Sequence, residues 1–331
     1  MKIVFAIVLL FISNFANAQG GRLTLSPGQP IMTSDISSTT LYYAPYTSDG
    51  YLILNSSLNW VMLLFSSGPT DQIGASMSGG SKWAAGTSRD IFGTFTGAIC
   101  SGPAWSSSDL PSRSLTRYNG VMVNAATLTC DTSASVSVPC PQYQCTYLGS
   151  ITNSITGQLE ADFSYGQTRK FEVWNAYNQI DNILQVGVVL PSSYKPQNIW
   201  PNFQPFNNDA NNRANVFTGL LTVVDVTYHQ NMYTNAQMSP SALASVVLWD
   251  GTDLGSTCLN SSDLASVLGA HSCVAHYFNA GVLGSHTATM GVAAANSPTS
   301  SMYAGNGAAN GVPVPPYSAE SNLIMYVRFK G

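Results

Sequence analysis

The sequence predicts an all-β protein with two tandem antiparallel β-sandwich domains, jelly-roll-like in character and carrying short helical insertions. Short runs of β-branched and aromatic residues recur along the chain, and clusters of Gly, Ser, Asn and Asp separate them. Such spacing is typical of sandwiches and jelly rolls. The 331 residues also exceed one average domain. We therefore expect an N-terminal domain over residues 19–185 and a C-terminal domain over residues 186–331.

Residues 1–18 have the features of a secretory signal peptide. Lys2 gives a positive start, and residues 3–15 are almost wholly apolar. Ala16-Asn17-Ala18 then supplies the small residues that a signal peptidase needs. The apolar run is short for a membrane span. The sequence predicts cleavage before Gln19 and export, with an uncleaved N-terminal anchor as the alternative.

Strand patterns follow in chain order at residues 51–55, 60–65, 90–96, 221–229 and 322–330. The last run alternates most clearly. Leu323, Met325, Val327 and Phe329 share one face, and Ile324, Tyr326, Arg328 and Lys330 share the other. This pattern predicts a half-exposed final strand.

The domain boundary is expected near residues 180–190. Residues 191–212, rich in Pro and Asn, are either an inter-domain link or a long loop of the second domain. Their end, "NNDANN" at 207–212, offers oxygen ligands but lacks the acidic ladder of a calcium loop, so a polar turn is expected. Within residues 258–273, the spacing of Leu264, Val267 and Leu268 predicts a short helix that Gly269 ends.

Six cysteines all follow the predicted signal: Cys100, Cys130, Cys140, Cys145, Cys258 and Cys273. An even number in an exported chain predicts three disulfides. The local closures expected first are Cys140–Cys145 and Cys258–Cys273, which leaves Cys100–Cys130. Paired CxxC knuckles that would indicate zinc do not occur in the sequence.

The charge balance argues against nucleic acid as a partner. Twelve Lys and Arg stand against sixteen Asp and Glu, and the net charge is −4. The longest basic run is Arg169-Lys170, whereas phosphate backbones need clustered cations. Ser, Thr, Asn, Gly and Tyr supply most of the polar character instead. Neutral surfaces of this kind are common on secreted and virion proteins, where they can meet sugars.

Motifs for catalysis are missing from the sequence. It contains no G-x-S-x-G element, P-loop, H-E-x-x-H or dinucleotide-binding glycine motif. The histidines, His229, His271, His276 and His286, lack a spacing that would align them on one helix or strand face. We therefore expect no enzyme activity, no cofactor and no metal site. A secreted hydrolase stays open as an alternative, because paired carboxylates cannot be located in a β-sandwich from spacing alone.

A resemblance to a known family begins at "RLTLSPGQPIMTSDISSTTLYYAPY" (22–46) and continues at "GPAWSSS" (102–108), "LTRYNGVMVNA" (115–125) and "YLGSI" (147–151). It resumes at "GQTRKFEVWNAYNQ" (166–179) and "ANNRANVFTGLL" (210–221). The chain resembles β-rich proteins of tailed phages and proteobacterial prophages, usually described as hypothetical or tail-fibre-like virion proteins. The resemblance implies a multi-domain β-sandwich on the outside of a virion and carries no catalytic residues.

The predicted signal peptide and the three predicted disulfides depart from that family pattern. Virion tail proteins usually lack a signal peptide and assemble in the cytoplasm, where disulfides are rare. Two functions are therefore expected. One is a virion-surface or tail-fibre-like protein that contacts other virion proteins, binds a host surface glycan or receptor, and assembles as a homotrimer. The other is an exported bacterial adhesin or carbohydrate-binding protein on the same fold, located in the medium, the periplasm or at the cell surface.

The stretch "TRKFEVWNAYNQ", residues 168–179, concentrates charges and aromatics in a chain with only 8% charged residues. It begins as a strand, and the spacing of Trp174 and Tyr177 then breaks the two-residue period. The pattern favours a buried joint between the domains. A sugar site made of Trp174, Asn175 and Tyr177 is the alternative, because aromatics and amides are what sugars contact.

Overall fold

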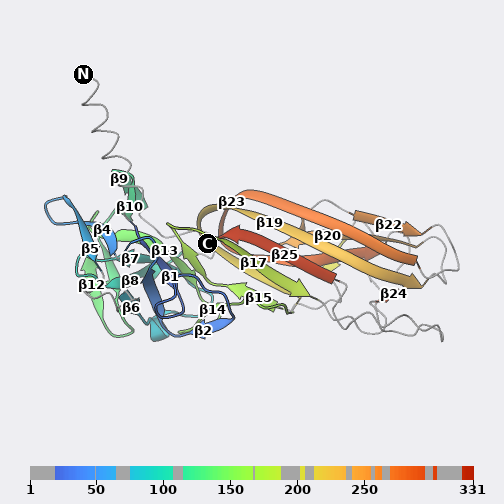
Figure 1. Ribbon diagram of the computed structural model, residues 1–331, viewed down its shortest axis with the longest axis horizontal. Helices are drawn as coiled ribbons and strands as arrows, with labels where there is room; N and C mark the ends of the chain where they lie inside the picture. The colour runs from blue at the N-terminus through green and yellow to red at the C-terminus, as the bar shows by residue number, and fades with distance from the viewer. Residues whose placement is uncertain are drawn as a thin grey trace, which may run out of the picture.

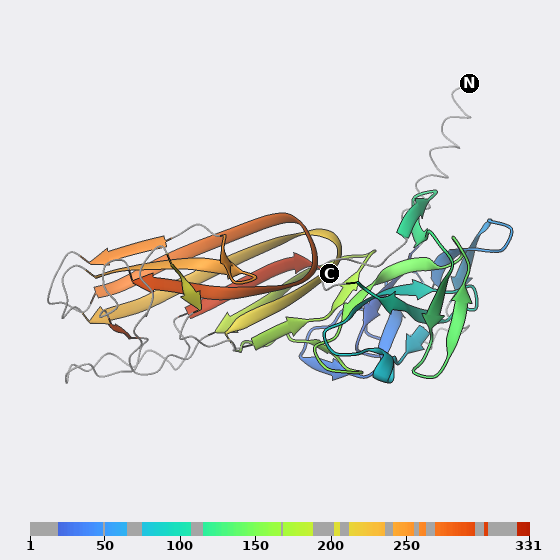
Figure 2. The same ribbon diagram turned by 180° about the vertical axis from the view of Figure 1, so that it is seen from behind.

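The computed structural model describes residues 19–48, 50–64, 75–106, 115–166, 168–187, 202–205, 212–235, 241–254, 258–262, 269–294, 301–303 and 323–331. Nearly every described element is a β-strand, which confirms the all-β sandwich-like fold. Figure 1 shows a compact lobe followed by an elongated one, and Figure 2 shows the same two lobes from behind. The described residues contain no helix long and apolar enough to span a membrane.

The first lobe contains three sheets of its own. Its strands are β1 (Gly21–Thr24), β2 (Ile36–Ser38), β3 (Leu41–Pro45), β4 (Gly50–Leu54), β5 (Trp60–Leu64), β6 (Ala75–Met77), β7 (Ser88–Gly93), β8 (Ile99–Ala104), β9 (Leu115–Tyr118), β10 (Val121–Asn124), β11 (Leu128–Asp131), β12 (Ser137–Cys140), β13 (Thr146–Thr152), β14 (Leu159–Ala161), β15 (Thr168–Phe171) and β16 (Val173–Asn175). A 3-10 helix, η1 (Gly80–Lys82), follows β6. The largest of these sheets runs β12-β11-β8-β7-β13-β10-β9, with β16 added beside β13, and β1-β3-β6 and β4-β5 form two smaller sheets.

The second lobe is built on two very long strands. Its strands are β17 (Asp181–Gly187), β18 (Gln204–Pro205), β19 (Arg213–Asn235), β20 (Ser241–Trp249), β21 (Thr252–Asp253), β22 (Cys258–Ser262), β23 (Gly269–Ala294), β24 (Ser301–Tyr303) and β25 (Leu323–Lys330). β19 and β23 pair antiparallel from Arg213↔Thr289 to Thr234↔Gly269, with register shifts near Thr222. These strands run along the long axis of the molecule (Figure 2).

The expected strands are present at their predicted places. The predicted runs at 51–55, 60–65 and 90–96 correspond to β4, β5 and β7, and the run at 221–229 lies inside β19. In β25 the alternation holds: Met325, Val327 and Phe329 are buried, while Arg328 and Lys330 are exposed. A strand with one face in the core and one in water requires this period of two.

The two lobes share one sheet and one hydrophobic core. β15 pairs antiparallel with β14 and parallel with β19, in the register Thr168↔Arg213 and Lys170↔Asn215. The sheet that begins at β2 and β14 therefore continues into the second lobe. The main core likewise extends from Leu23 of β1 to Phe329 of β25.

Because neighbouring side chains on a strand point to opposite faces, some strands of the first lobe also contribute to a second, smaller core. Val173 belongs to the main core, whereas its neighbour Trp174 belongs to the second one together with Phe92 and Tyr147. The four cysteines Cys100, Cys130, Cys140 and Cys145 are buried in that smaller core. Two disulfides, Cys100–Cys130 and Cys140–Cys145, join them as expected from the sequence.

Several predictions concern residues that lie wholly or partly outside the described part of the chain. The predicted signal peptide, residues 1–18, lies outside the described residues, as do most of residues 191–212. The backbones of Cys258 and Cys273 lie on β22 and β23, but their side chains lie outside the described part, so the predicted third disulfide stays a prediction. The helix expected after Cys258 falls largely on residues 263–268, also outside it, between β22 and β23. The predicted boundary at 185/186 lies within β17, which pairs with β25 along its whole length.

Candidate functional site at the junction of the lobes

The three side chains predicted as a binding site lie inside the junction, starting with Trp174. Its side chain is 1% exposed and stacks on Tyr147, with ring centroids 6.5 Å apart and planes at 29°. Its ring therefore offers no open face to a sugar. The indole Nε1 is buried without a hydrogen-bond partner among the described residues.

Asn175 holds β16 against β1. Its Oδ1 accepts the Leu23 N–H at 2.6 Å, and its Nδ2 donates to the Leu23 carbonyl at 3.2 Å. The amide thus pairs with both backbone groups of Leu23. Since neighbouring side chains on a strand point to opposite faces, Asn175 and Trp174 face different ways.

Tyr177 contacts a third element. It is half-buried, and its hydroxyl oxygen accepts the Met122 N–H of β10 at 2.9 Å. Burial raises the pKa of Tyr177, so the hydroxyl stays neutral. The structure thus does not bring Trp174, Asn175 and Tyr177 together on one surface, and each holds a different part of the joint.

The charged residues of the same stretch are paired with carboxylates. Arg169 lies 3.3 Å from the Asp35 carboxylate, which also accepts the N–H groups of Phe163 and Ser164. Burial of Asp35 opposes its ionisation, but these hydrogen bonds and the Arg169 charge outweigh it and lower the pKa of Asp35. Lys170 forms an ion pair with Glu160 and also donates to the Ser154 hydroxyl at 3.0 Å.

Glu172 is the most deeply buried carboxyl group of the junction. It is 3% exposed, and its two oxygens accept the N–H groups of Ser154 and Glu160, each at 2.7 Å. Burial raises the pKa of Glu172 to about 7, because desolvation of the charged form outweighs these hydrogen bonds. Near neutral pH the group is therefore close to its titration midpoint.

A cavity of about 290 Å³ lies beside Glu172, where the two lobes meet. Its lining combines charged, neutral polar and aromatic side chains from both lobes: Thr152, Asn153, Ser154, Lys170, Phe171, Glu172, Arg213, Asn215, Phe217 and Ser285, with Gly86 and Val216. A concave site with a few convergent polar groups and a perturbed carboxyl is the usual form of a ligand site. We define it as the junction pocket.

Of the twelve residues that line the junction pocket, the sequence drew attention only to Lys170, Phe171 and Glu172, and it missed the other nine, among them Arg213, Asn215 and Ser285. The parallel pairing of β15 with β19 places Arg213 opposite Thr168 and Asn215 opposite Lys170. The pairing of β19 with β23 then places Ser285 opposite Phe217. The sequence signal is the charged stretch 168–172, which contains the lining residues Lys170, Phe171 and Glu172. That signal does not indicate which residues of β19 and β23 lie opposite the stretch.

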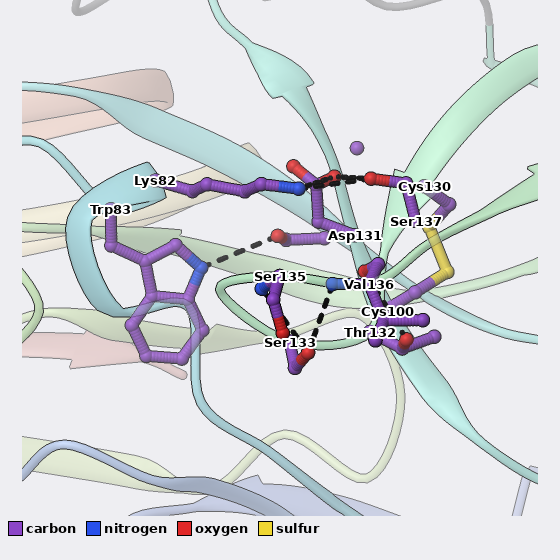
Figure 3. A network of polar contacts seen from close by, with 12 residues as sticks. Lys82, Trp83, Cys100, Cys130, Asp131, Thr132, Ser133, Ser135, Val136 and Ser137 are labelled. Atoms are coloured by element: carbon purple, nitrogen blue, oxygen red, sulfur yellow. Dashed lines mark hydrogen bonds and ion pairs between the residues drawn. A yellow bond between two sulfur atoms is a disulfide. The ribbon is translucent and has the colours of Figure 1, made fainter.

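A second polar cluster lies in the first lobe, around η1 and the β11–β12 hairpin (Figure 3). Lys82 of η1 contacts the Asp131 carboxylate at 2.6 Å, and the Ser137 hydroxyl donates to the same carboxylate at 2.6 Å. Burial opposes ionisation of Asp131, but these contacts and the charge of Arg89 lower its pKa. Asp131 follows directly on Cys130, so the cluster and the Cys100–Cys130 disulfide together hold the β11–β12 hairpin (Figure 3). Its charged groups pair with one another, and we assign it a structural role.

The histidines with described side chains also have partners. His276 contacts the Asp225 carboxylate at 2.6 Å, and His286 contacts Asp250 at 2.7 Å. His229 packs edge-to-face on Tyr326. Among the described residues no group of three or more His, Cys, Asp or Glu side chains could hold a metal ion.

Comparisons with known proteins add little. No protein-family model matches the chain. No curated protein matches it. Among solved structures, one similar chain comes from a structure of infectious bursal disease virus, Gx strain. The likeness has 10% sequence identity and a TM-score of 0.24, and it covers 94% of this chain and 75% of that chain. At so low a TM-score, nothing about the function of this chain follows from it.

Proposed function

We propose that the protein is a non-enzymatic structural protein of an external surface, tail-fibre-like on a virion, that binds a host glycan or receptor. Its elongated form, in which one sheet joins the two lobes, carries this proposal. β19 and β23 remain paired along almost their whole length, and β15 extends their sheet into the first lobe. A long lobe fixed to a compact one suits a protein that extends outward from an external surface (Figure 1).

Composition and disulfides support an external location. Only 8% of the residues are charged, and neutral hydrogen-bonding side chains are abundant. The two disulfides are of the kind that persists in oxidising surroundings outside the cytoplasm. The alternative function, an exported bacterial adhesin or carbohydrate-binding protein on the same fold, draws additional support from the predicted signal peptide.

The junction pocket favours binding over hydrolysis. Glycoside hydrolysis uses two carboxyl groups that face one bond. Among the described residues that line the pocket, Glu172 is the single carboxyl group, and both its oxygens accept backbone N–H groups. Lys170, Arg213, Asn215 and the pocket hydroxyls instead suit recognition of a polar ligand.

The natural location of the protein tests the virion proposal against the exported one. Purified virions, culture medium and cell envelopes are compared by mass spectrometry, and the N-terminal residue of the natural protein is determined. Protein in virions supports the tail-fibre-like role. Protein in the medium or envelope that begins at Gln19 supports the adhesin instead. Protein confined to the cytoplasm contradicts both.

We also propose that copies assemble as a homotrimer through the outward face of β17, β25, β19 and β23. Strand register brings four exposed apolar side chains onto this face: Ile183, Val223, Val274 and Phe278. Phe278 is 59% exposed, and Arg328, Asp225 and His276 lie between the apolar side chains on the same face, so the proposed subunit contact combines apolar and charged groups.

Light scattering coupled to size exclusion tests the trimer. We expect three times the protomer mass, and a monomer for Phe278→Ser. Leu254→Ser is the control, because Leu254 is 51% exposed but follows β21, away from this face. A monomeric parent protein, or a trimer that survives Phe278→Ser, contradicts the proposed contact.

A further inference from the structure

We infer that the junction pocket binds one carboxylated monosaccharide unit, such as a uronic or sialic acid residue at the end of a host glycan. This inference deepens the proposed glycan-binding role and rests on it. It concerns a site to which both lobes contribute, so the site forms only when the lobes are joined. Five segments build it: Gly86 before β7, the end of β13 with the residues after it, the β15–β16 stretch, the start of β19 and Ser285 of β23.

The pocket size fits one sugar ring. Its volume of about 290 Å³ lies at the lower end of small-molecule sites, which begin near roughly 300 Å³. The space suits a single ring and excludes a longer oligosaccharide from the interior. The rest of a glycan chain would therefore remain outside the pocket mouth.

Charge pairing leaves one cation available to a ligand. Lys170 is neutralised by its ion pair with Glu160. Glu172 uses both oxygens on backbone N–H groups, and none of the ion pairs among the described residues includes Arg213. The Nε of Arg213 is buried and has no hydrogen-bond partner among the described residues. Because the Nε is closed to solvent, a ligand carboxylate would pair with the guanidinium through its two terminal Nη groups, whose planar donors match a carboxylate in a two-point contact.

Neutral groups beside Arg213 suit the remainder of a sugar. Asn215 accepts the Thr287 hydroxyl at 3.0 Å through Oδ1, so its amide nitrogen is the group that can donate to a ligand. The exposed hydroxyl of Ser285 lies on the adjacent strand. Phe171 and Phe217 form apolar parts of the lining. A carboxylate beside hydroxyls and an apolar ring face is the chemistry of an acidic sugar, whereas an inorganic phosphate would favour several clustered cations.

The test uses the whole protein and four small probes in calorimetric titrations: glucuronic acid, N-acetylneuraminic acid, the methyl ester of glucuronic acid and acetate. The ester keeps the ring and hydroxyls of glucuronic acid but removes the charge. We expect binding of at least one acidic sugar, with the ester and acetate each bound at least tenfold more weakly. Acetate bound as well as the acidic sugars would reduce the site to a simple anion site and overturn the sugar assignment.

Two variants connect binding to the pocket. Arg213→Gln should weaken the acidic sugar roughly 10- to 100-fold, the range expected for a lost charged hydrogen-bond pair. Arg117→Gln is the matched control, because Arg117 is an exposed arginine on β9, outside both the pocket lining and the proposed trimer face. Ser285→Tyr should block the pocket while keeping Arg213, and it decides the question if Arg213→Gln does not fold.

A glycan array separates failure of this inference from failure of the proposed function. Binding of glycans that is indifferent to acidic sugars, or unchanged in both pocket variants, overturns the pocket assignment and leaves glycan binding intact. An array without any bound glycan, together with titrations that show no binding, overturns both the pocket assignment and the glycan-binding part of the proposed function.

Discussion

At the scale of one residue, burial and hydrogen bonding have opposite effects on the pKa of the Glu172 carboxyl group. Its carboxyl group is 3% exposed, and its oxygens accept two backbone N–H groups. These bonds favour the charged form, yet desolvation dominates and raises its pKa to about 7 from the ordinary 4.5. The folded protein therefore binds this proton more tightly than the unfolded chain does.

This raised pKa predicts a pH-dependent stability. The contribution of Glu172 is fully present below about pH 4.5 and is lost as the pH rises through about 7. The free energy of unfolding should fall by roughly 3 kcal/mol over that window, since one pKa unit corresponds to about 1.4 kcal/mol. Urea denaturation at pH 5, 6, 7 and 8 measures it. Other groups titrate as well, so the parent must be compared with Glu172→Gln, which should lack this component. Equal pH slopes in the two proteins would contradict the assignment.

At the scale of elements, the two disulfides constrain the chain to different extents. Cys100–Cys130 joins β8 to β11 across a separation of 30 residues, whereas Cys140–Cys145 closes a separation of 5 after β12. A longer closed loop removes more conformational freedom from the unfolded chain. The larger stabilisation should therefore come from Cys100–Cys130, whose neighbour Asp131 also forms the ion pair with Lys82.

Removal of each disulfide in turn checks this difference. The double substitution of Cys100 and Cys130 by Ala should lower the free energy of unfolding by roughly 3–4 kcal/mol, and that of Cys140 and Cys145 by roughly 2 kcal/mol. Chemical denaturation of the two variants beside the parent gives the values, and each variant is the control for the other. A larger loss for the Cys140–Cys145 variant would mean that native packing in the smaller core, and not loop length, decides the effect.

Local patterns in the sequence predicted the strands, because a strand's period depends on neighbouring residues alone. The alternation in β25 and the β-branched run inside β19 are clear examples. The junction pocket depends instead on which strands pair. Arg213 reaches Thr168 through a parallel contact between β15 and β19, and nothing in either segment specifies that contact. The burial of Trp174 could not be predicted from the sequence for the same reason, since it depends on Tyr147 of another strand.

At the scale of the whole molecule, the joint makes the lobes mechanically continuous. The main core runs through both lobes, and Ile180 and Gly331 exchange backbone hydrogen bonds at 3.1 Å. Arg22, 2% exposed, donates to the carbonyl oxygens of Pro30 and Asn178 and to the Gly331 oxygen. Burial lowers the pKa of Arg22 to about 10, so it remains charged at neutral pH. One side chain thus connects the first strand, the joint and the last strand.

This continuity predicts that the two lobes unfold together. Calorimetry of the parent protein should show one transition whose calorimetric and van't Hoff enthalpies agree, as for a single cooperative unit. Arg22→Lys should weaken the coupling, because an ammonium group cannot reproduce three donor directions of a planar guanidinium. We expect that variant to lose about 1–3 kcal/mol and its transition to broaden or split. Arg117→Lys is the control, since Arg117 is exposed on β9 and its guanidinium donates to the Gly120 carbonyl within its own hairpin. Two separate transitions in the parent would show that the shared sheet does not couple the lobes, and this would remove the support that a coupled, elongated form gives to the proposed surface role.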